Sequence, residues 1–383
     1  MKAGEERAVV WHQGGGEAAR TGRTAGHVGA RGEPIWALPM TGSVEASPVC
    51  DTAGRLYVAD TNETVRCFDQ HGRRQWEALV PGGVVATPAL DAEEERLFVG
   101  TVRGWVVALR AEDGRELWRQ EIPTDSDPRI VGDVLVVEEP ARKKPRLVVS
   151  SWGGRYWALD LEKGRPISQW EAGISPSARA AADAEGNVWS LRAIRKVGVE
   201  LIRTDPNAKT EVITRVPRGE RPVKRQWVVA GPVVDLQRGR VWFCGNRDRD
   251  CQIVAVDLRT GRELFRRSWD ATVCADPGIT ARGLLVFGDM QGRLVWVDLE
   301  REAIRSLDLD ADYVLAGPVC DREANGVWIG LPDGRVIRVR GPGHGVEKIT
   351  ELPRAVVGQL SVRSDGGLVV PCTDHQVYVW SGA

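Results

Sequence analysis

The stretch RLFVGTVRGWVVALRAEDGRELWRQEI, residues 96–122, reads as three consecutive antiparallel strands joined by two tight turns. RLFVGT and WVVAL are rich in β-branched and aromatic residues, and the Arg-Gly pair at 103–104 favours a turn between them. The EDG sequence at 112–114 predicts a second turn before the third strand, RELWRQEI. Because variants of this stretch recur along the chain, it defines a repeating unit of β-structure.

The unit repeats about every forty residues, which is a period typical of stacked structural units. Pairs that end in Pro mark the expected starts of units, at 47–48, 87–88, 127–128, 231–232, 276–277 and 317–318. Four short strands follow each mark, and in the third unit DPRIVG, residues 127–132, is the expected first strand. Four antiparallel strands in each of several units predict a β-propeller.

The two ends of the chain complete one blade between them. After residue 353 only three strands remain, QLSVR, GGLVVPC and HQVYVW, while EPIWALP at 33–39 resembles a fourth strand with no partners before it. Joining the four in one sheet closes the ring and removes exposed edges. The prediction is an all-β protein with a single eight-bladed propeller; seven blades is the alternative if the irregular fourth blade is misread.

The propeller is assigned to residues 32–383, and residues 1–31 form a separate N-terminal arm. The arm is rich in Gly, Ala and Arg and lacks periodicity, which predicts an extended or partly mobile segment. Trp11 is its only large apolar residue.

Tryptophan is unusually frequent, with 15 Trp against 5 Phe and 4 Tyr, which indicates a repeated slot for a large flat side chain. One aromatic residue falls at the same place in the fourth strand of several blades: Trp36, Trp76, Trp118, Trp170 and Phe265. Neighbouring blades diverge toward the rim, and a ring that fills the gap buries on the order of 200 Å². We therefore predict that these side chains dock one blade against the next, with stacking on a nucleobase or quinone as the alternative.

Composition argues against strong electrostatic partners. The 52 basic and 53 acidic residues leave a net charge of −1, which predicts no strong attraction to nucleic acid or to an anionic membrane. No apolar run approaches the roughly 20 residues needed to cross a bilayer. The seven Cys include no CxxC pair, and the first thirty residues lack the apolar core of a signal peptide. These features predict reduced thiols, a cytoplasmic location and no membrane partner.

The repeat resembles a known family. GRLYVAD or RLFVGT, then a strand ending in ALD or AVD, then GRELW, is similar to the pyrroloquinoline-quinone-like (PQQ-like) β-propeller repeat. WHQGGGEAARTG at 11–22 also resembles the Trp-x-x-x-x-Gly-x-x-x-Arg-Thr-Gly sequence found before many such propellers. The resemblance covers most of the chain and implies eight blades. It leaves function open, because the family includes quinone dehydrogenases, outer-membrane assembly lipoproteins and scaffold or sensor domains.

The sequence offers no pattern for catalysis. The dehydrogenases of this family typically carry an adjacent Cys-Cys pair and a calcium site, whereas no two Cys are adjacent here. Residues 14–24 lack the spacing of a phosphate-binding loop, and no two His are spaced for a metal. We therefore assign no catalytic, cofactor-binding or metal-binding residue and expect no cofactor. The weak candidates for a site in the central funnel are Asp127, Arg129, Arg179 and Asp276.

Two basic segments are the candidate partner-binding sites. The first is an insert in the third blade with Arg142, Lys143, Lys144 and Arg146. The second is the connector after the fourth blade, with Arg218, Arg221, Lys224 and Arg225. Together they predict a positive rim for an acidic protein or for nucleic acid, with a solvated loop as the alternative.

The function predicted from sequence is a non-enzymatic scaffold that binds a protein partner, as a subunit of a larger cytoplasmic assembly. A broad disc with variable loops offers large binding surfaces, and no catalytic constellation competes with that interpretation. The alternative is a small-ligand sensor or an enzyme that uses the central funnel.

Overall fold

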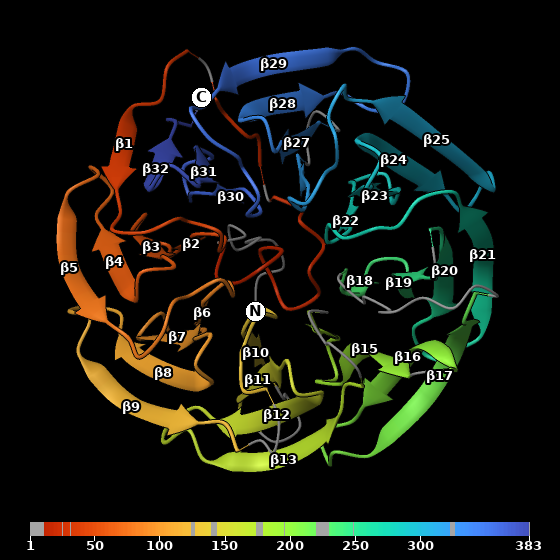
Figure 1. The fold of residues 1–383 in the computed structure, drawn as a ribbon, viewed down its shortest axis with the longest axis horizontal. Coiled ribbons are helices and arrows are strands. Elements are labelled where there is room, and N and C mark those ends of the chain that lie inside the picture. The colour runs from red at the N-terminus through yellow and green to blue at the C-terminus, as the bar shows by residue number, and fades with distance from the viewer. Residues whose placement is uncertain are drawn as a thin grey trace, which may run out of the picture.

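The protein is a ring of eight four-stranded antiparallel sheets around a central axis (Figure 1). The computed structural model describes residues 11–24, 26–30, 32–123, 127–138, 144–173, 179–194, 196–219, 230–247, 249–321 and 326–382. These residues form 32 strands. The eight-bladed prediction is confirmed, and the seven-bladed alternative is wrong.

The first four blades follow the chain from inside to outside, one strand after another. Blade one contains β2 (Val49–Cys50), β3 (Leu56–Ala59), β4 (Thr64–Phe68) and β5 (Arg74–Leu79). Blade two contains β6 (Ala89–Leu90), β7 (Arg96–Gly100), β8 (Trp105–Arg110) and β9 (Glu116–Glu121). Blade three contains β10 (Leu135–Val137), β11 (Arg146–Ser151), β12 (Arg155–Asp160) and β13 (Pro166–Glu171). Blade four contains β14 (Ala181–Ala182), β15 (Val188–Ile194), β16 (Gly198–Thr204) and β17 (Thr210–Pro217).

The remaining blades repeat this order, except that the last takes its outer strand from the beginning of the chain. Blade five contains β18 (Val233–Asp235), β19 (Arg240–Asn246), β20 (Cys251–Asp257) and β21 (Glu263–Trp269). Blade six contains β22 (Gly278–Ile279), β23 (Leu285–Gly288), β24 (Arg293–Asp298) and β25 (Ala303–Asp308). Blade seven contains β26 (Val319–Cys320), β27 (Val327–Gly330), β28 (Arg335–Val339) and β29 (Val346–Glu351). Blade eight contains β30 (Ser361–Val362), β31 (Leu368–Cys372), β32 (Gln376–Val379) and β1 (Trp36–Pro39).

Burial explains the two kinds of hydrophobic pattern in the repeat. The second and third strands lie between neighbouring blades and are buried on both faces, so β7 and β8 read as almost continuous apolar runs. The outer strand β9 alternates between half-buried and exposed residues, as a strand at the rim must. No helix among the described residues has the length and apolarity that crossing a bilayer requires.

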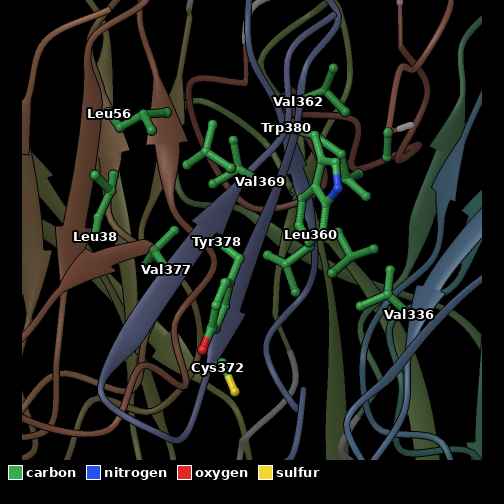
Figure 2. Packing of buried hydrophobic residues seen from close by; sticks show 14 of the residues in the cluster. Leu38, Leu56, Val336, Leu360, Val362, Val369, Cys372, Val377, Tyr378 and Trp380 are labelled. Atoms are coloured by element: carbon green, nitrogen blue, oxygen red, sulfur yellow. The ribbon is translucent and has the colours of Figure 1, made fainter. Parts of the chain in front are cut away.

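Blade eight closes the ring as the sequence predicts. β1 pairs with β32 in antiparallel register, from Trp36 opposite Val379 to Pro39 opposite Gln376. Figure 2 shows Leu38 of β1 near Val377 of β32 within the packed interior of this blade. The same apolar cluster includes Leu56 of blade one and Val336 of blade seven. Closure therefore joins both ends of the chain and both neighbouring blades in one core.

The first strand of blade three lies further along the chain than the sequence predicts. The expected strand was DPRIVG at 127–132, but the innermost strand is β10, Leu135–Val137. Within the expected segment Ile130 forms only an isolated bridge with Ser151. Pro128 instead packs beside the turn glycine Gly104 of blade two. The Asp-Pro pair therefore belongs to the connection between blades, and the position equivalent to the other Pro marks is 133–134.

Three tryptophans of the outer strands, Trp36, Trp76 and Trp118, lie against the next blade. Trp76 of blade one covers Gly114 in blade two, and its indole N–H donates to the Ala111 carbonyl at 3.0 Å. Trp118 of blade two likewise covers Gly164 in blade three and donates to Leu161 O at 2.9 Å.

Trp36 makes the same kind of contact, whereas the ring contacts of Trp170 and Phe265 lie within their own blades. Trp36 of blade eight covers Gly72 of blade one. Trp170 stacks on Tyr156 of its own blade with ring centroids 5.5 Å apart, and Phe265 lies 5.7 Å from Trp242. In blade four, which lacks the aromatic residue, Ile213 lies 3.2 Å from the position a Cβ of Gly261 would occupy. A smaller side chain thus occupies the same gap in the blade that the sequence marks as irregular.

The Trp–Gly contact predicts a position-specific glycine requirement. Gly164 and Gly239 both have positive φ angles, 68° and 62°, so alanine costs backbone strain at both. A Cβ at Gly164 would also lie 2.5 Å from the Trp118 ring, whereas nothing lies within 4 Å of one at Gly239. Gly164→Ala should therefore lower the free energy of unfolding by about 2 kcal/mol more than Gly239→Ala. Trp118→Ala should cost about 3 kcal/mol or more. Urea denaturation measures all three, and equal effects of the two Gly variants would refute blade docking by Trp118.

Candidate functional site

The innermost strands of the blades line the axis of the ring. They are two or three residues long, and contacts between neighbouring blades join most of them. Each pairs on one edge with the second strand of its blade, so its other edge faces the axis (Figure 1). Backbone N–H groups on such an edge require an acceptor from protein or water. The identity of that acceptor decides whether the ring has an open channel along its axis.

Residues 11–24, here called the axial segment, supply the acceptors. The second residue of seven innermost strands donates its backbone N–H to this segment over 2.7–2.9 Å. The donors are Cys50, Leu90, Val136, Ala182, Val234, Ile279 and Cys320. Six acceptors are backbone carbonyls, of Trp11, His12, Ala18, Ala19, Thr21 and Gly22, and the seventh is the side-chain oxygen of Gln13. Figure 1 shows the red trace of the axial segment inside the ring. The segment therefore bonds to blades one to seven in turn.

The chain continues from the axial segment to the eighth blade. Gly29 donates its N–H to Gly366 O at 2.9 Å and accepts from Leu368 N at 3.1 Å. The segment expected as an extended or partly mobile arm is thus bonded to all eight blades over its described residues. It is irregular, as expected, but most of it is buried.

The sequence of the axial segment fits this position. Trp11 is 1% exposed and belongs to the apolar cluster of the closing blade, while Ala19 joins the cluster of blades four and five. Gly22 has a φ of 63°, and a Cβ there would lie 2.6 Å from Pro318 O. The large residue anchors the start of the segment, and the glycine permits close approach to a blade.

A second layer of contacts surrounds the segment. In each blade the residue two positions before the innermost strand lies at an equivalent site, here called an axial position. These positions are Ser47, Thr87, Asp133, Arg179, Gly231, Asp276, Gly317 and Gln359. Thr87 donates its N–H to Asp133 Oδ1 at 2.9 Å, which links blades two and three. Gln359 accepts from Gly15 N at 2.9 Å, which links blade eight to the axial segment.

Four charged side chains form a buried network across the axis. Arg20 of the axial segment pairs with Asp133 at 2.8 Å, and both side chains are 2% exposed. Arg179 lies 2.8 Å from the same Asp133 oxygen and pairs with Asp276 at 2.5 Å. Burial alone would raise the pKa of Asp133, but the guanidinium groups of Arg179 and Arg20 outweigh it and hold that pKa below its ordinary value. The network carries two positive and two negative charges and joins three blades to the segment.

The funnel candidates from the sequence divide into two pairs. Arg179 and Asp276 meet in the buried axial network. Asp127 and Arg129 instead pair with each other in the connection between blades two and three, where Arg129 also lies 5.2 Å from the centre of the Trp152 ring. Sequence reasoning missed Arg20 and Asp133. The Arg-Thr-Gly ending of the lead-in motif was the available signal for Arg20.

An open depression of about 700 Å³ remains at one mouth of the channel. His12, Gly16 and Leu90 are among the residues that line it. Its carboxylates are Glu17, Glu93, Glu94, Glu138 and Asp183. His12 binds Glu94 over 2.7 Å. The pKa of Glu138 is raised by burial and further by the nearby carboxylates of Glu93 and Asp91. The mouth is therefore acidic, and the axial segment forms its floor.

Lys144 and Arg218, the described ends of the two basic segments, lie on opposite faces of the ring. One face, here called the hairpin face, carries the turns between first and second strands and between third and fourth strands. Lys144 is exposed just before the second strand β11, on this face, whereas Arg218 follows the fourth strand β17 and lies on the other face. Lys144 and Arg218 therefore do not belong to a single positive rim.

The remaining basic candidates differ in accessibility. Arg146 is 3% exposed within β11 and donates to Gly186 O at 2.8 Å, so its guanidinium group is not available to a partner. The other five candidates lie outside the described residues: Arg142, Lys143, Arg221, Lys224 and Arg225.

The cysteines do not form a reactive centre. All seven are free, and all but Cys274 are buried. Burial raises the pKa of Cys274 to about 11 and that of Cys67 to about 12, so their thiolates are scarce at neutral pH. Among the described residues, no three His, Cys, Asp or Glu side chains are grouped as a metal site would require.

Comparison with known proteins decides the family. A family model described as outer membrane protein assembly factor BamB matches residues 91–305, more than half of the chain. The chain belongs to this family. The match confirms the resemblance to PQQ-like repeats on which the sequence interpretation depends.

Curated relatives of this BamB-family chain carry the same name. Outer membrane protein assembly factor BamB of Shewanella oneidensis is 24% identical over 293 residues, 69% of each chain. Its counterpart in Xanthomonas campestris pv. campestris is 25% identical over 365 residues, which cover 90% of this chain and 82% of the relative. The similarity therefore extends beyond the stretch matched by the family model.

Solved structures share the fold. BamB from Moraxella catarrhalis matches with a TM-score of 0.68 and 16% identity, over 91% of this chain and 97% of the other. A europium-containing methanol dehydrogenase matches with a TM-score of 0.70 and 12% identity, over 95% of this chain and 89% of the other. An assembly factor and an enzyme thus fit the same ring about equally well, so fold does not separate their functions.

The predicted cytoplasmic location is wrong. Both curated relatives are named for the assembly of outer membrane proteins, which points away from the cytoplasm. The prediction depended strongly on the free thiols, and six of the seven are buried in blade cores. Cys244 and Cys251 lie in contact with each other, whereas a buried thiol without a partner in reach remains free in an oxidising compartment as well, so free thiols do not identify the location.

Proposed function

We propose that this BamB-family chain is a non-catalytic scaffold that binds a protein partner in the assembly of outer membrane proteins. The proposal transfers to this chain the role for which its relatives are named. It retains the prediction of a scaffold, and it replaces the predicted cytoplasmic assembly by the assembly of outer membrane proteins. The observation that carries it is the occupied axis of the ring.

An occupied axis favours a scaffold over a site in the funnel. A ligand held in the channel would have to displace the axial segment, which accepts hydrogen bonds from seven innermost strands. Each bond contributes about 0.5–1.5 kcal/mol, and a buried donor left without an acceptor costs more. The same bonds tie the blades to a common centre and make the ring rigid. A rigid disc presents its loops in fixed positions, which lowers the ordering cost of binding a protein.

The hairpin face is the proposed docking surface. Both the acidic mouth and a second depression, whose lining includes Arg238, Arg282 and Arg340, open among its turns. Loops on a rigid framework are the usual place for recognition. The crossover face, which carries the turns between second and third strands and the connections between blades, serves as the internal comparison.

Crosslinking tests the proposal. The tagged chain is purified from its native host after crosslinking, and crosslinked peptides are identified by mass spectrometry. The expected result is a stoichiometric complex with an outer membrane assembly protein whose crosslinks map to the hairpin face. Charge reversal at Glu93 and Glu138 should weaken this complex, while charge reversal at Asp310 and Asp333 on the crossover face should not. Recovery of the chain alone, or of a complex indifferent to both pairs of changes, would contradict the proposal.

A further inference from the structure

A second cavity, of about 430 Å³, lies on the hairpin face away from the axis. The turns that form it come from blades five, six and seven. Six arginines line it: Arg238, Arg240, Arg282, Arg301, Arg305 and Arg340. His344 adds a further basic group, whereas the acidic side chains are only Asp298 and Glu300. A strongly positive cavity stands out in a chain whose net charge is −1.

The two acids do not neutralise the cavity. Glu300 pairs with Arg240 but is 72% exposed, and Asp298 contacts Arg301 at 3.4 Å. Such rim pairs contribute little, about 0–1 kcal/mol each. Within the described part of the chain, Arg282 and Arg305 form no ion pair or side-chain hydrogen bond. Two guanidinium groups therefore line the cavity without a carboxylate partner.

A third arginine is fixed in orientation at the same cavity. Arg238 donates to Ala281 O at 3.1 Å and lies 3.4 Å from Asp235, which is fully buried. These contacts hold its side chain beside the turn that carries Arg282. Guanidinium groups bind carboxylate and phosphate oxygens through paired, charge-assisted hydrogen bonds. The cavity thus combines one positioned arginine with two that lack partners.

Much of the rest of the lining is apolar. Leu284, Trp296, Leu299, Ala303 and Pro342 contribute to the wall. The volume falls in the range of pockets that hold small molecules, roughly 300–1,000 Å³. An inorganic ion alone would leave the apolar wall in water. The fitting ligand carries an anionic group on a larger organic body.

We propose that this cavity binds a small organic anion, through carboxylate or phosphate groups held by Arg282 and Arg305. The site lies apart from the occupied channel, so it does not depend on an open funnel. It goes beyond the scaffold function and adds a ligand that would bind on the docking face. A bound anion there would change the charge that a partner meets.

Calorimetric titration of the full chain tests the site. The probes are ATP, citrate and inorganic pyrophosphate. ATP and citrate compare phosphate with carboxylate groups, and pyrophosphate has phosphate groups without an organic body. We expect saturable one-to-one binding of ATP or citrate with a Kd below about 1 mM. Pyrophosphate should bind more weakly than ATP, because it cannot cover the apolar wall.

Charge-matched variants locate the binding. The double variant Arg282→Gln with Arg305→Gln should weaken binding at least about tenfold, since charge-assisted contacts are lost. The control, Arg74→Gln with Arg119→Gln, removes the same charge from exposed positions on the outer strands of blades one and two. The single variants replace the double variant if it fails to fold. Absence of saturable binding by any probe, or equal weakening by both double variants, would overturn the proposal.

Discussion

Trp11→Ala is expected to lower the free energy of unfolding by about 3–5 kcal/mol, although Trp11 precedes the first strand of the ring by 25 residues. The indole is 1% exposed and packs in the cluster that joins blade eight to its neighbours. Its carbonyl also accepts from Cys50, so a displaced Trp11 leaves that donor without its partner. Urea denaturation followed by tryptophan fluorescence measures the loss.

Removal of residues 1–24 should have a larger effect. Seven innermost strands would lose their acceptors, and the expected loss of about 5 kcal/mol or more is comparable with the whole stability of a typical domain. A synthetic peptide of residues 9–24 should restore the ring in trans. The same peptide with Gly22→Ala should restore it poorly, because the added Cβ would meet Pro318 O at 2.6 Å. A truncated protein as stable as the full chain would refute the structural role of the segment.

Asp133→Asn is expected to cost about 3–5 kcal/mol, because it removes one charge from a buried network and leaves two arginines short of a partner. The Asp133 carboxylate pairs with both Arg20 and Arg179, and it also accepts a hydrogen bond from the Thr87 N–H group. The control is Asp127→Asn, which breaks the surface pair with Arg129 and should cost at most about 1 kcal/mol. A cost for Asp133→Asn no larger than that of the control would contradict the network.

The same carboxyl group predicts a pH dependence. The pKa of Asp133 is lowered in the folded protein, so its contribution to stability is present above the ordinary carboxyl pKa of about 4. That contribution is lost as the pH falls through the lowered value, since the unfolded chain then binds the proton more readily. When the pH is lowered from neutral to strongly acidic, the free energy of unfolding of Asp133→Asn should therefore fall by less than that of the wild type. An identical acid dependence would contradict the assignment.

The ring was predictable because its signals are local. Alternation in outer strands such as β9 and apolar runs such as β8 follow directly from burial, and the repeat multiplies each signal eight times. Closure by β1 followed from counting strands at the two ends. The one error of register, in blade three, arose because Asp127-Pro128 has the composition of an axial position but belongs to a connection.

The site was only partly predictable because its contacts are not periodic. The axial segment acts mostly through backbone carbonyls, which every residue possesses, so only Trp11, the glycines and the Arg20-Thr21 pair of the lead-in motif distinguish it in sequence. Arg179 and Asp276 could be named as funnel residues, but Asp133 was hidden by the register error. The basic cavity collects arginines from three blades, and no short sequence window contains them.

Hydrogen exchange tests most directly the claim that the channel is filled by the chain itself. The decisive amides are those of the innermost strands that donate to residues 11–24, read out as peptides that contain Cys50, Leu90, Ala182, Val234, Ile279 or Cys320. If the segment occupies the axis, these amides exchange among the slowest in the protein, and Trp11→Ala accelerates them together. If they exchange as fast as the exposed turn residues 112–113 in the wild-type protein, the channel is open and a ligand site in the funnel replaces the scaffold.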